Sequence, residues 1–349
     1  MKTTVPPLSR IDRLLIVKTS SIGDVLHALP LAQALKRARP SLTLGWVVRA
    51  RCADILRGNP HLDHLYVVPD KPSLGDLLAL RKTLHAARYQ VALDLQGLAL
   101  SGLLTRLSGA PVRVGWDRNR EANALFLTHP IVPGRDAARH EIDALFGFAD
   151  ALGVPYWGGV YPAQAYLAED SRAWADAELA NLPRPCVVLN VGASRAYKRW
   201  PGEHWAALAD SLAAQGAGLV FVGDKRDAAL AAQVREMMIT SHASVVDLAG
   251  QTGLRPLASV LAACDCVISA DTGPMHLAVA VGTPVVALFG GTDPRRHGPY
   301  GAGHTALHNP LPGELPSRRP SDAYGEACMR ALLPDDVLRA VPLLETPHA

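Results

Sequence analysis

Short apolar runs alternate with longer stretches of helical apolar spacing along the first half of the chain. The short runs predict buried strands, and the amphipathic stretches between them predict helices. The predicted strands are residues 14–18, 42–48, 65–68, 91–95 and 112–115, and the predicted helices are residues 25–38, 74–87 and 98–107. A series that starts with a strand and alternates in this way is typical of a parallel sheet with crossover helices.

The same pattern starts again near residue 186. Here the predicted strands are residues 186–191, 219–223, 245–248, 266–269 and 285–289, and the predicted helices are residues 203–215, 226–238, 254–263 and 275–281. A stretch rich in proline and glycine at 309–320 ends this series, and a last helix is expected at about 334–344. Two such series predict an α/β protein of two Rossmann-like lobes that face one another across a cleft.

The length of 349 residues suits two domains of about 150–180 residues each. We expect a first domain over residues 1–165 and a second over residues 180–320. The remaining segment, 321–349, is expected to cross back to the first lobe.

Charge is distributed unevenly between the two halves. Residues 1–160 carry 20 Lys and Arg against 13 Asp and Glu, a net of +7, whereas residues 161–349 carry 15 against 19, a net of −4, which together give the formal +3. A basic first half favours an anionic partner there, such as a phosphate, a carboxylate or a membrane surface. The alternative is an uneven but solvated surface.

Composition excludes several other classes. No stretch of 18 uncharged apolar residues is present, and residues 1–10 lack the pattern of a signal peptide. The five cysteines are odd in number and have no CxxC spacing, which argues against a disulfide framework and against a zinc site. We therefore expect a cytoplasmic protein.

The first candidate site is the loop after the predicted strand 14–18. Residues 19–24 read Thr-Ser-Ser-Ile-Gly-Asp and lead directly into a helix, whose N-terminus favours anions. Gly23 belongs to neither a GxGxxG nor a GxxxxGK pattern, so dinucleotide and P-loop sites are not indicated. Asp24 at the helix start is either a first-turn carboxylate that complements the helix dipole or a general base.

The second half carries three further loops at strand ends. Residues 270–276 place Asp271, Thr272, Gly273 and His276 around a helix that opens with Pro274, a geometry suited to a diphosphate or merely to a capped helix. Residues 192–201 contain three cations in five positions, which suit a pyrophosphate or form a solvated face. Asp224 follows a strand where Rossmann folds place a carboxylate that contacts ribose.

Taken together, these residues resemble a known family. The strings Val-Lys-Thr-Ser-Ser-Ile-Gly-Asp-Val-Leu-His at 17–27, Asp-Leu-Gln-Gly at 94–97, Arg-Val-Gly at 113–115, Lys-Arg-Trp-Pro at 198–201 and Asp-Thr-Gly-Pro-Met-His at 271–276 resemble glycosyltransferase family 9, the lipopolysaccharide heptosyltransferases. They cover the chain from about residue 14 to 341. The resemblance implies the GT-B fold, an ADP-L-glycero-D-manno-heptose donor and inversion at the anomeric carbon.

The resemblance also implies roles for single residues. Asp24 would be the catalytic base, with Lys18 near it. The donor-binding residues would be Ser194, Lys198, Asp271, Thr272, Gly273 and His276. The chain departs from the family's pattern at Ala193, where enterobacterial members carry a hydroxyl, and at Lys225, near their ribose-binding glutamate; Asp224 is the expected substitute.

The acceptor implied is the Kdo region of the inner core, Kdo–lipid A, which carries carboxylates and phosphates. We expect Lys18, Arg113, Arg118 and Arg120 to bind it. The chain has no DxD metal motif, so we expect metal-independent catalysis without a cofactor. Peripheral contact with the cytoplasmic face of the inner membrane is expected, and a nucleic-acid partner is not.

Three alternatives remain open at this point. The nearest is a family member of type II or III, which acts on an already heptosylated core; the string at 18–21 favours the first transfer. A sugar-nucleotide epimerase also has two Rossmann-like lobes, but no reactive carboxylate pair is recognisable. A two-lobed binding protein of the periplasmic kind is disfavoured by the missing signal pattern.

Overall fold

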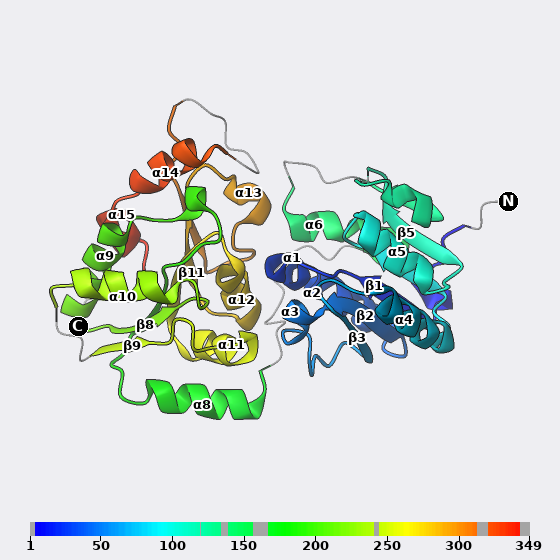
Figure 1. Ribbon diagram of the computed structural model, residues 1–349, viewed down its shortest axis with the longest axis horizontal. Helices are drawn as coiled ribbons and strands as arrows, with labels where there is room; N and C mark the ends of the chain where they lie inside the picture. The colour runs from blue at the N-terminus through cyan, green and yellow to red at the C-terminus, as the bar shows by residue number, and fades with distance from the viewer. Residues whose placement is uncertain are drawn as a thin grey trace. The chain divides into compact units, whose positions relative to one another are not determined.

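The computed structural model describes residues 4–118, 120–133, 139–155, 167–240, 244–312 and 320–342. The chain divides into two compact units, Met1–Tyr166 and Leu167–Ala349 (Figure 1). Each unit contains one six-stranded sheet of parallel strands with helices packed against it.

The sheet of unit 1 has the order β3-β2-β1-β4-β5-β6. Its strands are β1 (Arg13–Val17), β2 (Thr43–Arg49), β3 (His64–Val68), β4 (Val91–Asp94), β5 (Val112–Trp116) and β6 (His129–Val132). Its helices are η1 (Leu8–Arg10), α1 (Ile22–His27), α2 (Leu29–Ala38), α3 (Ala50–Ala53), α4 (Leu74–Ala87), α5 (Ala99–Leu107), η2 (Asn123–Phe126), α6 (Glu141–Leu145) and α7 (Gly147–Ala151).

The sheet of unit 2 has the order β12-β11-β10-β7-β8-β9. Its strands are β7 (Cys186–Asn190), β8 (Gly218–Val222), β9 (Val245–Asp247), β10 (Cys266–Ala270), β11 (Val285–Phe289) and β12 (Thr305–His308). Its helices are α8 (Glu169–Leu179), η3 (Ala196–Lys198), α9 (Gly202–Ala214), α10 (Ala228–Met237), α11 (Leu254–Ala263), α12 (Gly273–Val281), α13 (Pro294–His297), α14 (Asp322–Arg330) and α15 (Pro334–Arg339).

Both sheets therefore follow one topology. In each, the first strand of the unit is paired with the second on one side and with the fourth on the other, which is the doubly wound order 3-2-1-4-5-6. Ligands of such sheets bind beyond the carboxyl ends of the strands, where the order reverses between the first and fourth strands. In unit 1 this point lies between β1 and β4, and in unit 2 between β7 and β10.

Each unit has its own apolar core. In unit 1, β1, β2 and β4 pack against α4 and α5 through Leu15, Val47, Ala92, Leu84 and Leu104, all of which are buried. Burial of one such side chain stabilises the fold by about 1.5–3 kcal/mol. In unit 2 the sheet packs against α9 and α10 in the same way.

The C-terminal helices complete the core of unit 2. Met329 of α14 and Val337 of α15 are fully buried in it, and the Trp200 indole donates to the Leu332 carbonyl at 2.9 Å. Apolar side chains of residues 320–342 thus cover the sheet of their own unit, and the expectation that this segment crosses back to the first lobe stays a prediction. Residues 343–349 lie outside the described residues.

α14 also packs closely against η3. The Cα of Gly325 faces Tyr197, and a Cβ at position 325 would lie 2.4 Å from Tyr197 Cβ and 2.7 Å from Tyr197 O. Only glycine therefore fits where α14 crosses the turn that carries Lys198.

Several elements differ from the sequence-based expectation, among them the following. The helix expected over 25–38 is two helices, because Pro30 has no N–H for the Leu26 carbonyl and the chain bends at Ala28. The sequence did not predict the short edge strands β6 and β12. It also did not predict the helix α8, which lies between the two predicted series.

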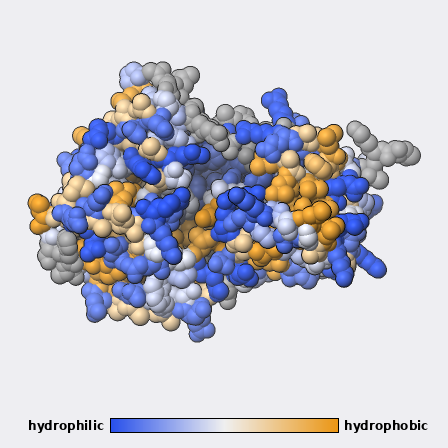
Figure 2. Space-filling model, in the orientation of Figure 1, coloured by the Kyte–Doolittle hydropathy of each residue, from blue (hydrophilic) through white to orange (hydrophobic). Residues whose placement is uncertain are grey.

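No helix among the described residues is long and apolar enough to cross a membrane. On the face drawn in Figure 2, hydrophilic residues cover most of the surface, and apolar residues gather on part of unit 1.

Candidate active site

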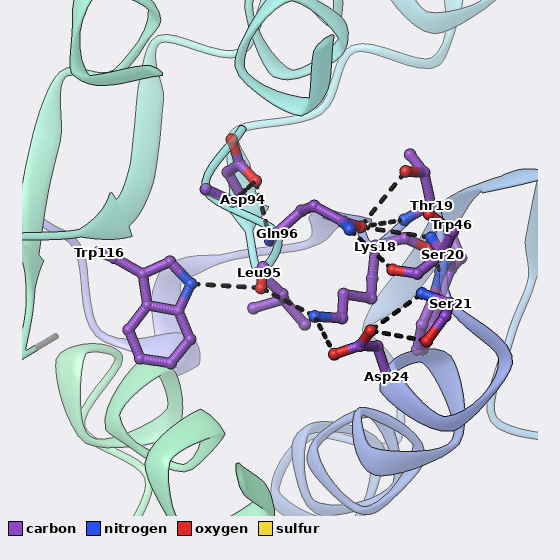
Figure 3. Close-up of polar contacts among 11 residues, drawn as sticks. Lys18, Thr19, Ser20, Ser21, Asp24, Trp46, Asp94, Leu95, Gln96 and Trp116 are labelled. Atoms are coloured by element: carbon purple, nitrogen blue, oxygen red, sulfur yellow. Dashed lines mark hydrogen bonds and ion pairs between the residues drawn. The ribbon is translucent and has the colours of Figure 1, made fainter. Parts of the chain in front are cut away.

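The central feature of unit 1 is a buried lysine beside a carboxylate at the carboxyl end of β1 (Figure 3). Lys18 follows β1 directly, and its side chain is fully buried. Its Nζ lies 3.5 Å from Asp24 Oδ1 and 3.3 Å from the Leu95 carbonyl oxygen. A buried ammonium needs such a partner, since a buried charge without one is costly. Asp24 thus lies within ion-pair distance of the buried lysine.

Asp24 occupies the third position of α1. Its Oδ2 accepts hydrogen bonds from Ser21 N at 3.0 Å and from Ser21 Oγ at 2.8 Å, as in a capping box. Its side chain is 26% exposed, whereas Lys18 is not exposed at all. The carboxylate is therefore held by the protein and still partly exposed, so a helix-capping role and a catalytic role are both compatible with this position.

The adjacent loop after β4 is built on another buried carboxylate. Asp94 Oδ1 accepts from Gln96 N and Gly97 N, both at 3.0 Å, and Oδ2 accepts from Ser101 Oγ at 3.0 Å and Asn123 Nδ2 at 2.7 Å. Burial raises the pKa of Asp94, although these donors act in the opposite direction. Asp94 therefore organises the turn, and being fully buried it is not offered to a substrate.

The expected acceptor residues do not form one group. Arg113 lies near the amino end of β5, in register with Ala92, and its guanidinium donates to the carbonyls of Phe126 at 2.7 Å and Ala110 at 2.8 Å. This places it at the opposite edge of the sheet from Asp24, so its prediction as an acceptor contact is wrong. Lys18 is also wrong as a direct contact, because it is buried against Asp24.

Arg118 and Arg120 are placed differently. Both are exposed in the loop that follows the carboxyl end of β5, and Arg120 N donates to the Gly97 carbonyl at 3.2 Å. They therefore lie on the same edge of the sheet as Asp24. Arg49, which was not predicted, ends β2 on this edge, and its backbone N donates to Thr19 O at 3.1 Å.

In unit 2, Asp271 lies between a lysine and a histidine side chain at the carboxyl end of β10. Lys198 Nζ donates to Asp271 Oδ2 at 2.6 Å and to the Asp271 carbonyl at 3.1 Å. His276 Nε2 lies 3.8 Å from Asp271 Oδ1. The Asp271 and His276 side chains are each 9% exposed, and Lys198 is 21% exposed. The structure therefore brings three of the predicted donor residues together.

The loop before α12 continues this group. Thr272 is the residue before the helix, and its hydroxyl contacts Asn190 Nδ2 at 2.9 Å and Ser269 Oγ at 3.1 Å. Asn190 ends β7, so this contact joins the two strands between which the sheet order reverses. Gly273 and Pro274 open the nine-residue helix, whose first amides form an anion-binding end.

Ser194 and Asp224 lie on the same edge of the sheet but apart from this cluster. Ser194 is exposed in the loop after β7. Asp224 follows β8 and accepts hydrogen bonds from Arg226 N at 2.7 Å and Arg226 Nε at 3.0 Å. The side-chain hydrogen bond from Arg226 lowers the pKa of Asp224. Its role toward a ribose stays a prediction.

A neighbouring carboxylate, Asp227, was not predicted. Its Oδ2 accepts from Asp224 N at 3.0 Å, and burial raises its pKa. A Cβ at Gly192 would lie 2.0 Å from the Asp227 carboxyl carbon, so the loop after β7 passes directly over this carboxylate. Gly192 was visible in the sequence as part of a loop motif, whereas nothing in the sequence singled out Asp227.

Comparison with known proteins identifies the family. The family model for glycosyltransferase family 9 (heptosyltransferase) matches residues 77–327. Lipopolysaccharide heptosyltransferase 1 of Escherichia coli K12 is 31% identical over 318 residues, which cover 85% of this chain and 94% of that protein. Lipooligosaccharide heptosyltransferase 2 of Haemophilus influenzae is 28% identical over 327 residues, which cover 89% and 92%.

Solved structures show the same likeness. E. coli heptosyltransferase WaaC with ADP-2-deoxy-2-fluoro heptose has a TM-score of 0.71 at 29% identity, over 94% of this chain and 98% of that chain. E. coli ADP-heptose lps heptosyltransferase II has a TM-score of 0.80 at 23% identity, over 95% and 98%, and so supports the fold alone. The two sheets match those of GT-B enzymes, and the chain belongs to glycosyltransferase family 9, the heptosyltransferases.

Proposed function

We propose that this protein transfers L-glycero-D-manno-heptose from ADP-heptose to the Kdo region of the lipopolysaccharide inner core, with inversion at the anomeric carbon. The observation that carries the proposal is the partly exposed Asp24 carboxylate, which is held by Ser21 and lies beside the buried Lys18. The relative named heptosyltransferase 1 and the solved relative that binds an ADP-heptose analogue support the donor and the acceptor.

The chemistry is a single displacement in which Asp24 acts as general base. Its carboxylate accepts the proton of an acceptor hydroxyl while that oxygen forms the bond to the anomeric carbon. The bond from this carbon to ADP breaks at the same time, and the electron pair leaves on the terminal phosphate of ADP. The buried ammonium of Lys18, 3.5 Å from Asp24 Oδ1, places a positive charge beside the proposed base.

The leaving diphosphate would be stabilised in unit 2. An ammonium has three donors, and Asp271 occupies two of those of Lys198, which leaves a third for a phosphate oxygen. The first amides of α12, after Thr272, add a partial positive charge that favours the developing negative charge. Asp271 in turn fixes the position of Lys198 and of His276. Ser194 and Asp224 remain proposed contacts of the donor.

The acceptor would be bound by cations on the carboxyl edge of the unit 1 sheet. Arg118 and Arg120 are exposed there, and their guanidinium groups suit carboxylates and phosphates. A lipid-linked acceptor also implies peripheral contact with the cytoplasmic face of the inner membrane. The facing of the two lobes across a cleft stays a prediction.

The second candidate is a later transfer, to a core that already carries heptose. The observation that favours it is the 28% identity to a heptosyltransferase 2 over 89% of the chain, close to the 31% for heptosyltransferase 1. The two candidates share the donor and the mechanism proposed above and differ only in the acceptor.

A mass-spectrometric assay separates these functions. Purified protein is incubated with ADP-heptose and either deacylated Kdo–lipid A or the same acceptor already carrying one heptose. We expect a gain of one heptose on the first acceptor, and equal turnover with EDTA, since catalysis is proposed to be metal-independent. Product from the heptosylated acceptor alone would establish the later transfer instead. No product from either acceptor would reject the proposed function.

A further inference from the structure

The side chain of Gln96 holds the backbone that leads to Asp24 (Figure 3). Its Oε1 accepts hydrogen bonds from Thr19 N at 2.9 Å and Ser20 N at 3.3 Å, and its Nε2 donates to Ser20 O at 2.7 Å. The next residue, Ser21, supplies both hydrogen bonds to Asp24 Oδ2. One amide group therefore fixes the segment whose last member orients the carboxylate.

The same turn also holds the lysine. The Leu95 carbonyl, one residue before Gln96, accepts from Lys18 Nζ at 3.3 Å and from Trp116 Nε1 at 3.2 Å. The Lys18 carbonyl accepts from Trp46 Nε1 at 3.0 Å. The Ser21 donors and the Lys18 ammonium, which contact Asp24, are thus positioned from residues 95 and 96.

The turn can serve as a support because it is itself fixed. The four hydrogen bonds to Asp94 hold the amides of Gln96 and Gly97 and tie them to Asn123 of η2. Asn123 is buried, and its Nδ2 also donates to Leu98 O at 2.7 Å. The four hydrogen bonds to the buried Asp94 carboxylate therefore restrict the backbone of this turn.

We propose that Gln96 is a positioning residue for the transfer: it sets the orientation of the Asp24 carboxylate through Thr19, Ser20 and Ser21. This inference rests on the proposed role of Asp24 as the base. Proton transfer depends steeply on geometry, and a displacement of about 1 Å can lower a rate by about 10²-fold. Loss of the Gln96 hydrogen bonds should therefore lower kcat while leaving donor binding, proposed for unit 2, unchanged.

The test uses Gln96→Met, which keeps the volume of the side chain and removes its hydrogen bonds. The chain offers a matched control at the other end of the same strand. Gln90 precedes β4, and its Oε1 accepts from Asp12 N at 2.6 Å and Arg13 N at 3.0 Å. Gln90→Met thus removes a similar pair of hydrogen bonds to the backbone, at the end of the strands opposite Asp24.

We expect Gln96→Met to lower kcat by about 10-fold or more with the KM for ADP-heptose within about twofold of wild type. Gln90→Met should lower the melting temperature similarly and leave kcat unchanged. Gln96→Glu, which keeps the acceptor for Thr19 N and Ser20 N but loses the donor to Ser20 O, should lower kcat less. If Gln96→Met does not fold, the kcat of Gln96→Glu tests the positioning role instead. Wild-type kcat in the folded Gln96 variants, or an equal fall in Gln90→Met, overturns the proposal.

A double-mutant cycle separates this inference from the proposed function. In an Asp24→Asn background, Gln96→Met should lower kcat by less than twofold, because the group it positions is already gone. If Asp24→Asn alone leaves kcat at the wild-type value, the proposed base is wrong. If Asp24→Asn abolishes turnover but Gln96→Met does not lower it, the base stands and the positioning role fails.

Discussion

Asp24 and Asp76 have almost the same local geometry. Asp76 occupies the third position of α4, and its Oδ2 accepts from Ser73 N at 2.8 Å and Ser73 Oγ at 2.6 Å. Asp24 makes the corresponding contacts with Ser21 and in addition lies beside the buried Lys18. Helix capping alone therefore does not explain Asp24, whereas it does explain Asp76.

This pair gives a matched test of the proposed base. Asp24→Asn should lower kcat by about 10² or more, because the amide cannot accept the proton of the acceptor. It should also destabilise the fold by about 1–3 kcal/mol, less than for a fully buried pair, since the lost carboxylate is 26% exposed. Asp76→Asn should leave kcat at the wild-type value. Steady-state kinetics measure kcat, and a denaturation curve measures the stability of each variant. Normal turnover in Asp24→Asn would refute the catalytic role.

Lys198 offers a second test at single-residue scale. Lys198→Ala should weaken ADP binding by about 1–3 kcal/mol, the range for one charge-assisted hydrogen bond. The control is Arg235→Ala, which breaks the 2.9 Å ion pair with Asp247 in the same unit. Calorimetry should find wild-type ADP affinity in the control. Unchanged affinity in Lys198→Ala as well would reject the placement of the diphosphate.

At the scale of elements, Asp63 joins α2 to β2. Its Oδ2 accepts from Lys36 Nζ at 2.9 Å and from Leu44 N at 2.7 Å. Partial burial raises the pKa of Asp63, but the hydrogen bonds from Lys36 and Leu44 outweigh it and lower the pKa overall. The folded state therefore binds this proton less tightly than the unfolded state does.

The consequence for stability has a definite sign. A depressed carboxyl pKa stabilises the fold above the unfolded value of about 3.9, and this contribution is lost as the pH falls through the folded pKa. Asp63→Asn should lower stability at pH 6 and reduce the difference in stability between pH 6 and pH 3. Urea denaturation at these two pH values measures the change, which should be small because the Asp63 side chain is 40% exposed. An undiminished difference would show that Asp63 is not linked to folding.

The sequence predicted central elements better than edge elements. The buried strands β1, β4, β7 and β10 are continuous apolar runs, which is the pattern of strands covered on both faces. The edge strands are short, and β6 contains histidine and proline while β12 contains threonine and histidine, so hydropathy did not reveal them. The bend at Ala28 could have been predicted, because Pro30 interrupts the helical hydrogen bonds.

In the candidate site, the sequence predicted residues that a local pattern reveals and missed contacts between distant segments. Asp24, Lys198 and Asp271 follow strands and stood out by position and charge. The contacts of Gln96 with residues 19 and 20 join segments about 76 residues apart, and no local pattern reports such pairing. The prediction for Arg113 failed because its position near the amino end of β5, rather than its charge, decides at which end of the strands it lies.

At the scale of the molecule, the charge asymmetry predicts a dependence on salt. Residues 1–160 carry a net +7, and exposed charges are screened over about 8 Å at physiological ionic strength. The KM for a soluble, deacylated acceptor should therefore rise with added KCl, and the KM for ADP-heptose should rise less. A soluble acceptor is required, because adhesion to a membrane would depend on salt as well.

A double variant tests where this charge acts. Arg118→Ala with Arg120→Ala should raise the KM for the acceptor and flatten its dependence on salt. The control, Arg81→Ala with Lys82→Ala, removes two exposed cations of α4 from the same unit. It should leave the KM for the acceptor and its dependence on salt unchanged. Equal effects of the two double variants would mean that net charge, rather than the loop after β5, draws the acceptor.

The close approach of α14 to Tyr197 has a consequence for which substitutions the protein tolerates. Position 325 is distant from Lys198 in the sequence, yet any larger residue there would press on the backbone of the preceding residue, Tyr197. In a saturation screen for heptose transfer, position 325 should accept glycine alone. Gly325→Ala should weaken ADP binding, although no atom of Gly325 is proposed to touch the nucleotide. Selection would thus preserve this glycine as strictly as it preserves the donor site, for a reason that only the tertiary structure reveals.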